Sequence, residues 1–299
     1  MIVIADSGST KTTWRVVLRG HLSFDVATAG INAVRDDEAT IRQTVQRACA
    51  AIRDEFLEGR ASSLASESSP TAIYFYGAGC LPAFTAPLKR VLAEVFPMSE
   101  CVVESDLLGA AHALYGKAEG IACILGTGSN SCLFDGQRIV QNVSPLGWIL
   151  GDEGSGAVLG RRLVGDVLKG QLPETVCSVF LQRFGLQVSD IIEAVYRKAQ
   201  PNRFLASLVP FLAEHRDVEA VHALLVGEFR RFFVRNVAAY SRRDLPVGFV
   251  GSVAYHFSDE LAEAAEAEGF VLGDILQSPM DRLESYFRER ARQFVPQNF

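Results

Sequence analysis

A strand–turn–strand pattern occurs twice in this 299-residue chain and constrains its fold more than any other feature. The second copy has an apolar run, the turn Gly126-Thr127-Gly128-Ser129-Asn130 and another apolar run, which is typical of a β-hairpin. An offset of 120 residues places Val3-Ile4-Ala5 on Cys123-Ile124-Leu125, Gly8-Ser9 on Gly128-Ser129, and Trp14 on Phe134. The offset predicts two copies of one unit, each opening its own half of the molecule. The alternative is a chance match between two ordinary glycine-rich hairpins.

Both turns have the composition of an anion-binding site. Glycine lets the backbone approach a ligand, and consecutive N–H groups together with Ser and Thr hydroxyls bind anions. The first turn, Asp6-Ser7-Gly8-Ser9-Thr10-Lys11-Thr12, has neither the spacing of a P-loop nor that of a Rossmann fingerprint. An acid beside hydroxyls and a lysine fits a Mg²⁺-phosphate site at Asp6, and the alternative is an Asp that closes a turn. Two such turns would hold a polyphosphate from both sides.

Length and charge narrow the functional classes. The chain is long enough for two domains with separate cores, and a net charge of -6 without a block of one sign argues against nucleic acid or a membrane surface as the main partner. The N-terminal residues do not form a signal peptide and no run can span a membrane, so a cytoplasmic protein is expected. Its six cysteines lack a CxxC pair and its five histidines lack an HxxxH pair, which predicts reduced thiols and no dedicated zinc or iron site.

The order of elements predicts two duplicated α/β lobes with a central cleft, residues 1–116 and 117–279. In the first lobe, strands are expected at 2–6, 12–18, 22–28, 73–76 and 101–104, helices at 37–57 and 84–96, and a surface connector at 59–70. Asp36 or Asp37 is the candidate N-cap of the first helix. In the second lobe, strands are expected at 121–125, 138–143, 247–254 and 269–272, helices at 157–168 and 256–267, and a helical insert at 174–243. The terminal helix, 280–299, is expected to pack back on the first lobe.

Three further segments hold candidate functional residues. Asp106 follows a strand and opens a helical run, so it is either a general base or a helix N-cap. The segment from Gly147 to Gly156 combines four glycines with two acids before a helix, which favours a polar-ligand site over a plain turn. A glycine turn at 77–79 ends the strand at 73–76, which is a usual place for a ligand to approach, and the expected strand at 247–254 contains a second glycine elbow. The apolar stripe of 218–240 predicts core or a dimer face, and the arginines beside it (Arg230, Arg231, Arg235, Arg242 and Arg243) predict a solvated surface.

Four motifs resemble the BadF/BadG/BcrA/BcrD ATPase and N-acetylglucosamine kinase family of the sugar kinase, actin and Hsp70 superfamily. They are residues 6–12, 126–130, 147–155 and 248–253, and the resemblance spans residue 2 to about residue 255. It implies two ribonuclease-H-like lobes that close on MgATP and an amino sugar. Ser7 and Ala33 depart from the family, where Gly and Pro are common.

The resemblance also implies the roles of single residues. Asp6 would place Mg²⁺ through water. The phosphates would lie on Ser7, Gly8, Ser9, Thr10, Lys11, Thr12, Gly126, Thr127, Gly128 and Ser129, and the adenosine along Gly251 and Ser252. The sugar pocket would comprise Asn32, Gly77, Asp106, Asn130, Gly147, Trp148 and Asp152. Asp106 would accept the proton of the sugar 6-hydroxyl, and an Asp with an unperturbed pKa of about 3.9 is ionised at neutral pH.

Three functions compete at this stage. The first is an amino-sugar kinase, with N-acetylglucosamine as the first choice of acceptor, and the aromatic-rich helix suggests a homodimer. The second is an activator ATPase of a dehydratase or reductase, whose [4Fe–4S] cluster would bridge two subunits through cysteines near the nucleotide, such as Cys123 and Cys132. The third is a sugar or nucleotide sensor without turnover. Asp106 and the 151–156 segment favour the kinase.

Overall fold

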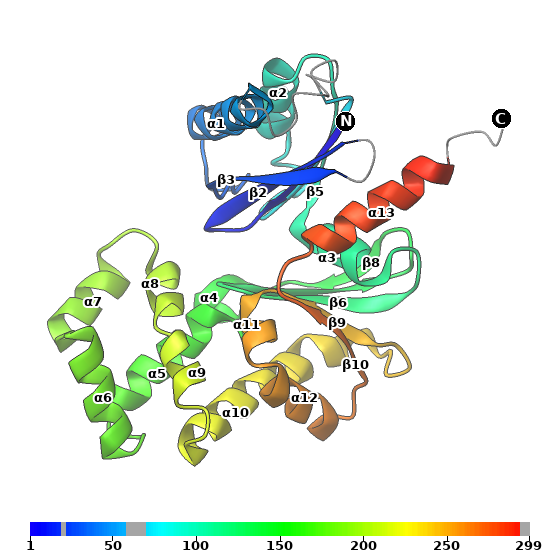
Figure 1. Ribbon diagram of the computed structural model, residues 1–299. Coiled ribbons are helices and arrows are strands. Elements are labelled where there is room, and N and C mark those ends of the chain that lie inside the picture. Colours follow the sequence, from blue (N-terminus) through cyan, green and yellow to red (C-terminus); the bar gives the residue numbers. More distant parts are fainter. Residues whose placement is uncertain (19–21, 58–69, 294–299) are drawn as a thin grey trace. The chain divides into compact units, whose positions relative to one another are not determined.

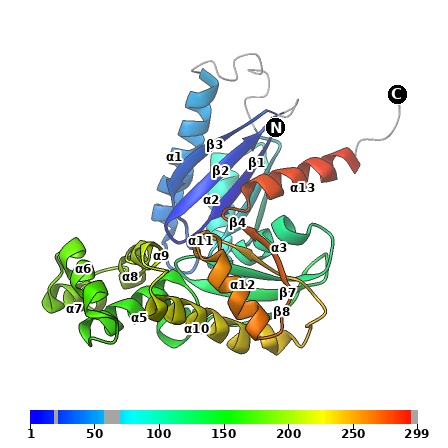
Figure 2. The ribbon, with the colours of Figure 1, turned by 60° about the horizontal axis from the view of Figure 1, so that its bottom comes forward.

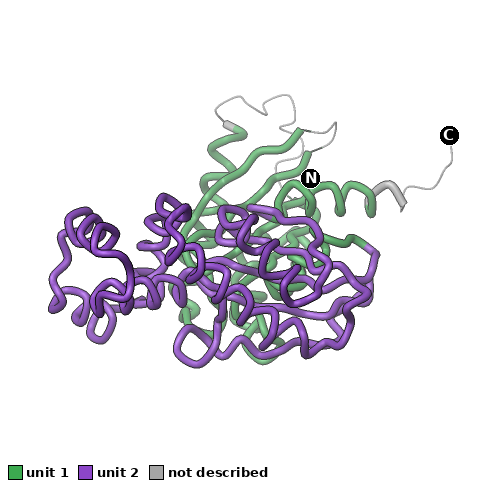
Figure 3. Tube along the Cα trace, turned by 90° about the horizontal axis from the view of Figure 1, so that it is seen from below, with its two compact units in different colours: residues 1–116, 279–299 green, residues 117–278 purple. Residues whose placement is uncertain are grey.

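The computed structural model describes residues 1–18, 22–57 and 70–293, with side chains through residue 290. Contacts divide the chain into two compact units (Figure 3): unit 1, Met1–Gly116 with Pro279–Phe299, and unit 2, Lys117–Ser278. The connector predicted at 59–70 lies, apart from Pro70, outside the described residues, as does the predicted helix beyond residue 293. None of the helices in the described ranges combines the length and apolarity that crossing a membrane requires.

Unit 1 is built on one mixed sheet of order β3-β2-β1-β4-β5. The first three strands are antiparallel neighbours, whereas β4 is parallel to β1 and β5 is parallel to β4. The strands are β1 (Ile2–Ser7), β2 (Lys11–Val17), β3 (Ser23–Ala29), β4 (Ala72–Gly77) and β5 (Glu100–Ser105), and the helices are α1 (Glu38–Leu57), α2 (Ala86–Val95), α3 (Asp106–Tyr115) and α13 (Met280–Gln293) (Figure 1).

The helices of unit 1 cover both faces of its sheet. Successive strand residues point to opposite faces. Val3 and Ala5 therefore join the core under α1 and α2, while Tyr74 and Tyr76 meet Phe287 of α13 on the other face. Figure 2 shows α1 and α13 on the two sides of the sheet. Asp37 Oδ1 accepts a hydrogen bond from the Thr40 N–H at 2.8 Å, so Asp37 rather than Asp36 caps α1.

Unit 2 repeats this topology with a second sheet of order β10-β9-β6-β7-β8. The strands are β6 (Gly120–Leu125), β7 (Ser129–Phe134), β8 (Ile139–Val143), β9 (Val247–Val250) and β10 (Leu272–Leu276). As in unit 1, the first three are antiparallel neighbours and the last two add in parallel beside the first strand. The shared topology confirms the predicted duplicated α/β fold.

The helices of unit 2 are α4 (Gly147–Leu150), α5 (Gly156–Leu168), α6 (Glu174–Phe184), α7 (Val188–Tyr196), α8 (Pro201–Ser207), α9 (Pro210–Glu214), α10 (Glu219–Arg235), the 3₁₀ turn η3 (Val237–Tyr240), α11 (Ser252–His256) and α12 (Ser258–Ala267). The apolar stripe of α10 is core: Val221, Leu225, Phe229, Phe232 and Phe233 are all fully buried within the unit. The stripe therefore provides no dimer face, and the homodimer stays a prediction without that support.

Three details of the sequence prediction are wrong. The last strand pair before the turn is Ser7–Thr12 in the first hairpin and Leu125–Ser129 in the second. The first strands of the two hairpins are therefore offset by 118 residues and not by 120. Phe134 pairs with Gly120 as Val17 pairs with Ile2, so Phe134 corresponds to Val17 and not to Trp14. The strand expected at 247–254 ends at Val250, because Gly251 has φ +129° and α11 begins at Ser252. The strand expected at 269–272 starts only at Leu272, because Gly269 has φ +71° and turns the chain after α12.

Candidate active site

The first turn of unit 1 is fastened to the loop that follows β3. Ser7 Oγ lies 2.7 Å from Thr12 Oγ1, donates to the Ile31 carbonyl and accepts from the Ile31 N–H, while Thr12 Oγ1 donates to the Ala29 carbonyl. Both hydroxyls are fully buried. Ser7 and Thr12 therefore hold the loop, and the exposed residues of the turn, Gly8, Thr10 and Lys11, are left to meet an anion.

Gly30 allows this loop to approach the turn closely. A Cβ added at Gly30 would lie 2.2 Å from the Gly8 carbonyl oxygen and 2.9 Å from the Thr10 nitrogen. The Gly30 N–H donates to the Thr10 carbonyl at 3.1 Å. Only a residue without a side chain fits this position.

Asn32 and the 77–79 turn lie together in unit 1. The Ala33 N–H donates to the Ala78 carbonyl, and a Cβ on Gly79 would lie 2.5 Å from Asn32 Oδ1. Asn32 Oδ1 accepts from the N–H groups of Val34 and Arg35 at 3.0 and 3.1 Å. The carbonyl end of the amide is thereby fixed, and no described residue accepts from Nδ2, which can donate to a ligand.

Asp106 is not the N-cap of α3. Ser105 caps this helix, since its Oγ accepts from the Leu108 N–H at 3.2 Å. Asp106 is instead the first residue of the helix, and its Oδ1 accepts from the adjacent Leu107 N–H at 2.9 Å. The N-cap interpretation is therefore wrong, and among the described residues the Asp106 carboxylate bonds only to backbone N–H groups within the first turn.

Asp6 and Asp106 come together at one end of the parallel strands. Asp6 of β1 is level with Tyr76 of β4, which is level with Glu104 of β5, two residues before Asp106. Burial, and then the negative charge of Asp106, raises the pKa of Asp6 to about 7. Burial raises the pKa of Asp106 to about 6, against the opposing effect of the Leu107 N–H. The unperturbed value expected for Asp106 is therefore wrong, because its carboxylate is partly desolvated.

This pair of carboxylates fits a bound divalent cation. Two desolvated acids near one another leave negative charge that a cation would neutralise. The described residues contain no cluster of three or more His, Cys, Asp or Glu that could hold a metal. Magnesium fits such a sparse site, since it keeps several waters and takes one or two carboxylates plus substrate phosphates.

In unit 2, the Gly126–Ser129 turn lies against Asp152. The Asp152 carboxylate accepts a hydrogen bond from the Ser129 N–H, and a Cβ on Gly128 would lie 3.1 Å from Asp152 Oδ2. Burial raises the pKa of Asp152 to about 6 despite that hydrogen bond. Asp152 has φ +51°, a left-handed conformation that is uncommon for a residue with a side chain. The fold thus brings two predicted motifs, far apart in sequence, to one place.

The residues of unit 2 predicted to bind the sugar differ in how far their groups are already used by contacts within the protein. Asn130 Oδ1 accepts from the Ser131 N–H and from Asn142 Nδ2, both at 2.9 Å, so its carbonyl end is committed to the strands. Gly147 has φ +74° and opens α4, and Trp148 packs partly against the core of unit 2. The Asp152 N–H donates to the Pro145 carbonyl at 2.9 Å, which closes the 145–152 segment on itself. We call this segment the α4 loop.

A cavity of about 480 Å³ adjoins the Gly126 turn, a volume within the range of small-ligand sites. Gly251 precedes the lining residue Ser252 and approaches the start of the Gly126 turn closely, because a Cβ there would be 2.2 Å from the Leu125 carbonyl oxygen. The cavity is lined by Gly126, Thr127, Gly156, Ala206, Val209, Pro210, Ala213, Glu214, Ser252, Val253, His256 and Phe257. Three of these were predicted to bind the nucleotide, namely Gly126, Thr127 and Ser252. Sequence reasoning missed the residues from α8 and α9, since no motif distinguishes them from the rest of the helical insert.

No family model and no curated protein sequence matches the chain. Among solved structures, it is similar to a putative N-acetylglucosamine kinase from Porphyromonas gingivalis, with 49% identity and a TM-score of 0.87 over 97% of this chain and 100% of that one. It is also similar to a putative N-acetylglucosamine kinase from Chromobacterium violaceum, with 18% identity and a TM-score of 0.73 over 95% and 98% of the two chains. The ethanolamine utilization protein EutJ from Carboxydothermus hydrogenoformans matches with 16% identity and a TM-score of 0.52 over 95% and 87%. The last two similarities show the fold alone.

Proposed function

We propose that this chain, which belongs to the family of the Porphyromonas gingivalis putative N-acetylglucosamine kinase, is an ATP-dependent amino-sugar kinase. The first choice of acceptor is N-acetylglucosamine and the first choice of position is its 6-hydroxyl. The observation that carries the proposal is that Asp6 and Asp106 lie together at the carboxyl ends of parallel strands, where one acid can hold a cation and the other can accept a proton. Membership of this family supports a phosphoryl transfer, a class of reaction that depends chiefly on positioning and charge neutralisation.

In the proposed reaction, Asp106 accepts the proton of the sugar hydroxyl. The hydroxyl oxygen forms a bond to the γ-phosphorus of ATP, and the bond between that phosphorus and the β,γ-bridging oxygen breaks, which releases ADP. An Asp whose pKa is about 6 is mostly ionised at pH 7 and is a stronger base than an exposed Asp. When bound at Asp6, Mg²⁺ supplies neutralisation of phosphate charge.

The remaining predicted residues have supporting roles in this proposal. The backbone of the Gly126–Ser129 turn and the exposed part of the 8–11 turn would bind phosphate oxygens, and the cavity beside Thr127 and Ser252 would receive the adenosine. The Asn32 Nδ2 group and the Asp152 carboxylate would hold sugar hydroxyls or the amide of the acetyl group. Both are polar groups fixed in place by neighbouring backbone, as a selective sugar pocket requires.

The activator ATPase is the weaker alternative. A cluster that bridges two subunits needs thiolates at the surface, whereas Cys123 and Cys132 are both fully buried in adjacent strands. Burial also raises the pKa of Cys123 well above its usual range, which disfavours the thiolate that binds iron.

Sugar-dependent ADP release with MgATP tests the proposed function. We expect one amino sugar in a panel with plain hexoses to stimulate release, and Asp106→Asn to lower kcat by at least about 100-fold, the usual scale of general-base loss. Glu104→Gln is the matched control, because Glu104 lies two residues earlier in β5 and is exposed. Equal ATP hydrolysis by all three proteins without response to any sugar would refute the kinase.

A further inference from the structure

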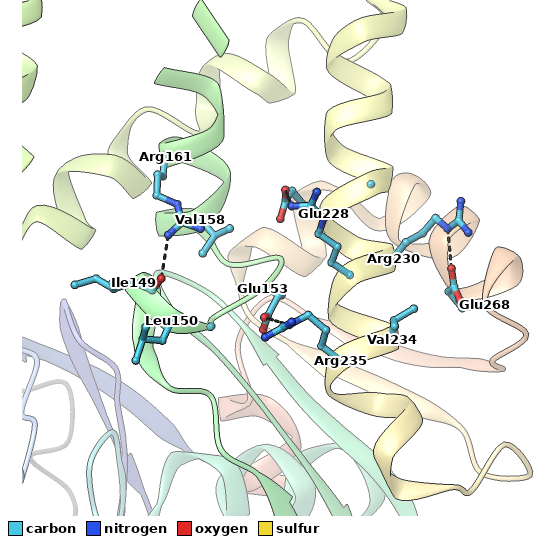
Figure 4. Close-up of a pocket in the computed structure, with 13 residues that line it drawn as sticks. Ile149, Leu150, Glu153, Val158, Arg161, Glu228, Arg230, Val234, Arg235 and Glu268 are labelled. Carbon is cyan, nitrogen blue, oxygen red and sulfur yellow. Dashed lines mark hydrogen bonds and ion pairs between the residues drawn. The ribbon is translucent and has the colours of Figure 1, made fainter. Parts of the chain in front are cut away.

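A second cavity in unit 2, of about 620 Å³, lies outside the residues assigned to substrates above. It is bounded by the α4 loop, α5 and α10 (Figure 4). Its lining residues include four arginines, Arg161, Arg230, Arg231 and Arg235, and an apolar part formed by Ile149, Leu150, Val158 and Val234. The sequence predicted a solvated face for three of these arginines, but the fold gathers them around a concave surface.

Some of the arginines around this cavity are each paired with a carboxylate of their own, whereas those near Glu228 are not. Arg235 pairs with Glu153, and Arg230 pairs with Glu268 at 2.7 Å, so each of these arginines has its own carboxylate. Glu228, by contrast, is buried and pairs with two arginines, Arg231 at 2.9 Å and Arg162 at 3.3 Å. The charge of Arg161 also acts on Glu228, and no carboxylate of the described residues pairs with Arg161.

Near Glu228, the positive charges of Arg231, Arg162 and Arg161 outnumber the single Glu228 carboxylate, which leaves an excess of positive charge beside the cavity. A phosphate monoester or hydrogenphosphate carries nearly two negative charges at pH 7. Arginine binds phosphate oxygens with several N–H donors in one plane, and such charge-assisted hydrogen bonds are strong. The charge and the donors match a phosphate group.

The same arginine holds the α4 loop. The Nη1 group of Arg161 donates to the Trp148 carbonyl oxygen at 2.8 Å. It also donates to the Ile149 carbonyl oxygen at 3.4 Å (Figure 4). Directly after the loop, Glu153 is held by Arg235 and by Asn236 Nδ2. An anion that draws Arg161 toward itself competes with the Trp148 and Ile149 carbonyls, so it loosens one attachment of the loop.

We propose that the cavity beside Glu228 is an effector site for a phosphate group, either free phosphate or the ester of a phosphorylated sugar, and that its occupation changes the α4 loop through Arg161. Arg161 and Arg231 bind the phosphate oxygens, and Ile149, Leu150 and Val234 receive the body of an ester. The effect on sugar binding rests on the proposed function, in which the loop contributes Trp148 and Asp152 to a sugar pocket. The binding of the anion itself does not depend on the proposed function.

The chain offers a matched pair of variants for the test. Arg231 and Arg230 are neighbours on α10, both line the cavity, and their side chains are 58% and 53% exposed. Arg231 shares Glu228 with another arginine, whereas Arg230 is neutralised by Glu268. The proposal therefore expects Arg231→Gln to weaken phosphate binding by about tenfold or more, as loss of one charge-assisted hydrogen bond requires, and Arg230→Gln to leave it nearly unchanged.

Binding is measured by calorimetry and Trp148 fluorescence on the full chain, with inorganic phosphate and with a hexose 6-phosphate at constant ionic strength. Trp148→Phe identifies the part of the fluorescence change that comes from the loop. Tighter binding of the ester than of phosphate identifies the ester as the ligand, and equal binding identifies free phosphate. No binding of either probe, or equal weakening by both arginine variants, overturns the proposal.

A kinetic measurement separates this proposal from the proposed function. With a working amino-sugar substrate, phosphate should raise KM for the sugar in the unmodified protein and in Arg230→Gln, but not in Arg231→Gln. An unchanged KM in the unmodified protein while the site is saturated overturns the coupling to the loop. If no sugar supports turnover, the proposed function fails, and the titrations still decide whether the cavity binds phosphate.

Discussion

At the scale of single residues, the unusual state of Asp6 has a consequence for stability. Its pKa is about 7 in the folded protein and about 3.9 in an unfolded chain, so folding takes up a proton between these values. Without metal, the stability that protonated Asp6 provides is complete below pH 4 and is lost as the pH rises through 7.

The variant Asp6→Asn tests this at residue scale. An amide imitates the protonated acid and has no charge to desolvate. We expect the melting temperature of the metal-free variant to exceed that of the unmodified protein at pH 8, and this difference to shrink as the pH falls and to vanish near pH 4. Added Mg²⁺ should raise the melting temperature only where Asp6 is present. A less stable variant at pH 8 would show that the Asp6 charge is compensated in the folded protein.

The Ser105–Asp106 pair shows what single residues reveal in sequence. Both residue types favour the N-cap position, and the sequence pattern cannot say which of two adjacent candidates has the extended backbone that a cap needs. The choice depends on where β5 stops, which is set by its pairing with β4. Ser7 is a similar case. The composition of its turn suggested a ligand contact, but its hydroxyl is hydrogen-bonded to Ile31, a residue 24 positions away.

At the scale of elements, the junction between β9 and α11 depends on Gly251. Its φ of +129° is accessible in practice to glycine alone, and a Cβ would lie 2.2 Å from a backbone oxygen that cannot move independently of β6. We expect Gly251→Ala to lower the free energy of unfolding by about 3 kcal/mol, the upper end for one strained residue. Gly116→Ala is the control: φ is +61° but the added Cβ meets nothing, so a cost of about 1 kcal/mol is expected. Urea unfolding of both variants measures the difference, and equal costs would contradict the steric argument.

The helices and strands could be predicted from hydrophobic periodicity, whereas the residues that the helical insert contributes to the cavity beside the Gly126 turn could not. The buried face of α1, with Ile41, Val45, Ala48 and Ile52, follows directly from its spacing. Ala206 of α8 also has ordinary insert spacing, and it lines the cavity where α8 packs closely on α5: a Cβ on Gly160 would lie 2.0 Å from the Leu205 carbonyl oxygen. The packing of α8 on α5 is a tertiary contact, so no local sequence pattern could have predicted it.

At the scale of the whole molecule, the duplication could be predicted although its register could not. The two hairpins have different turn lengths, so one fixed offset matches residues on only part of each copy. The two units share the order and direction of their strands. Aligning the two halves of the sequence residue by residue detects this similarity only weakly. The duplication also leaves each unit with its own core and one tryptophan: Trp14 is buried in unit 1 and Trp148 packs on the core of unit 2.

The C-terminal helix completes the first unit although the chain reaches it after the second. The Phe287 ring stacks on Tyr74 at 4.0 Å, Tyr286 stacks on His112 at 4.6 Å, and Arg15 of β2 bonds to Glu284. Phe287→Ala leaves a cavity that should cost unit 1 about 3 kcal/mol, and Phe180→Ala should cost unit 2 a similar amount. Fluorotryptophan NMR during urea unfolding follows Trp14 and Trp148 separately.

If the units unfold as separate cores, Phe287→Ala shifts the midpoint of the Trp14 signal to lower urea and leaves that of Trp148 in place, while Phe180→Ala does the reverse. One common midpoint that moves equally in both variants would instead show that the chain unfolds as a single cooperative structure. Because α13 follows unit 2 in the sequence, the first outcome also means that unit 1 cannot reach its full stability before the whole of unit 2 has been synthesised. Folding of the acid pair at Asp6 and Asp106 would then depend on a helix that comes after unit 2, through the packing of α13 on α3.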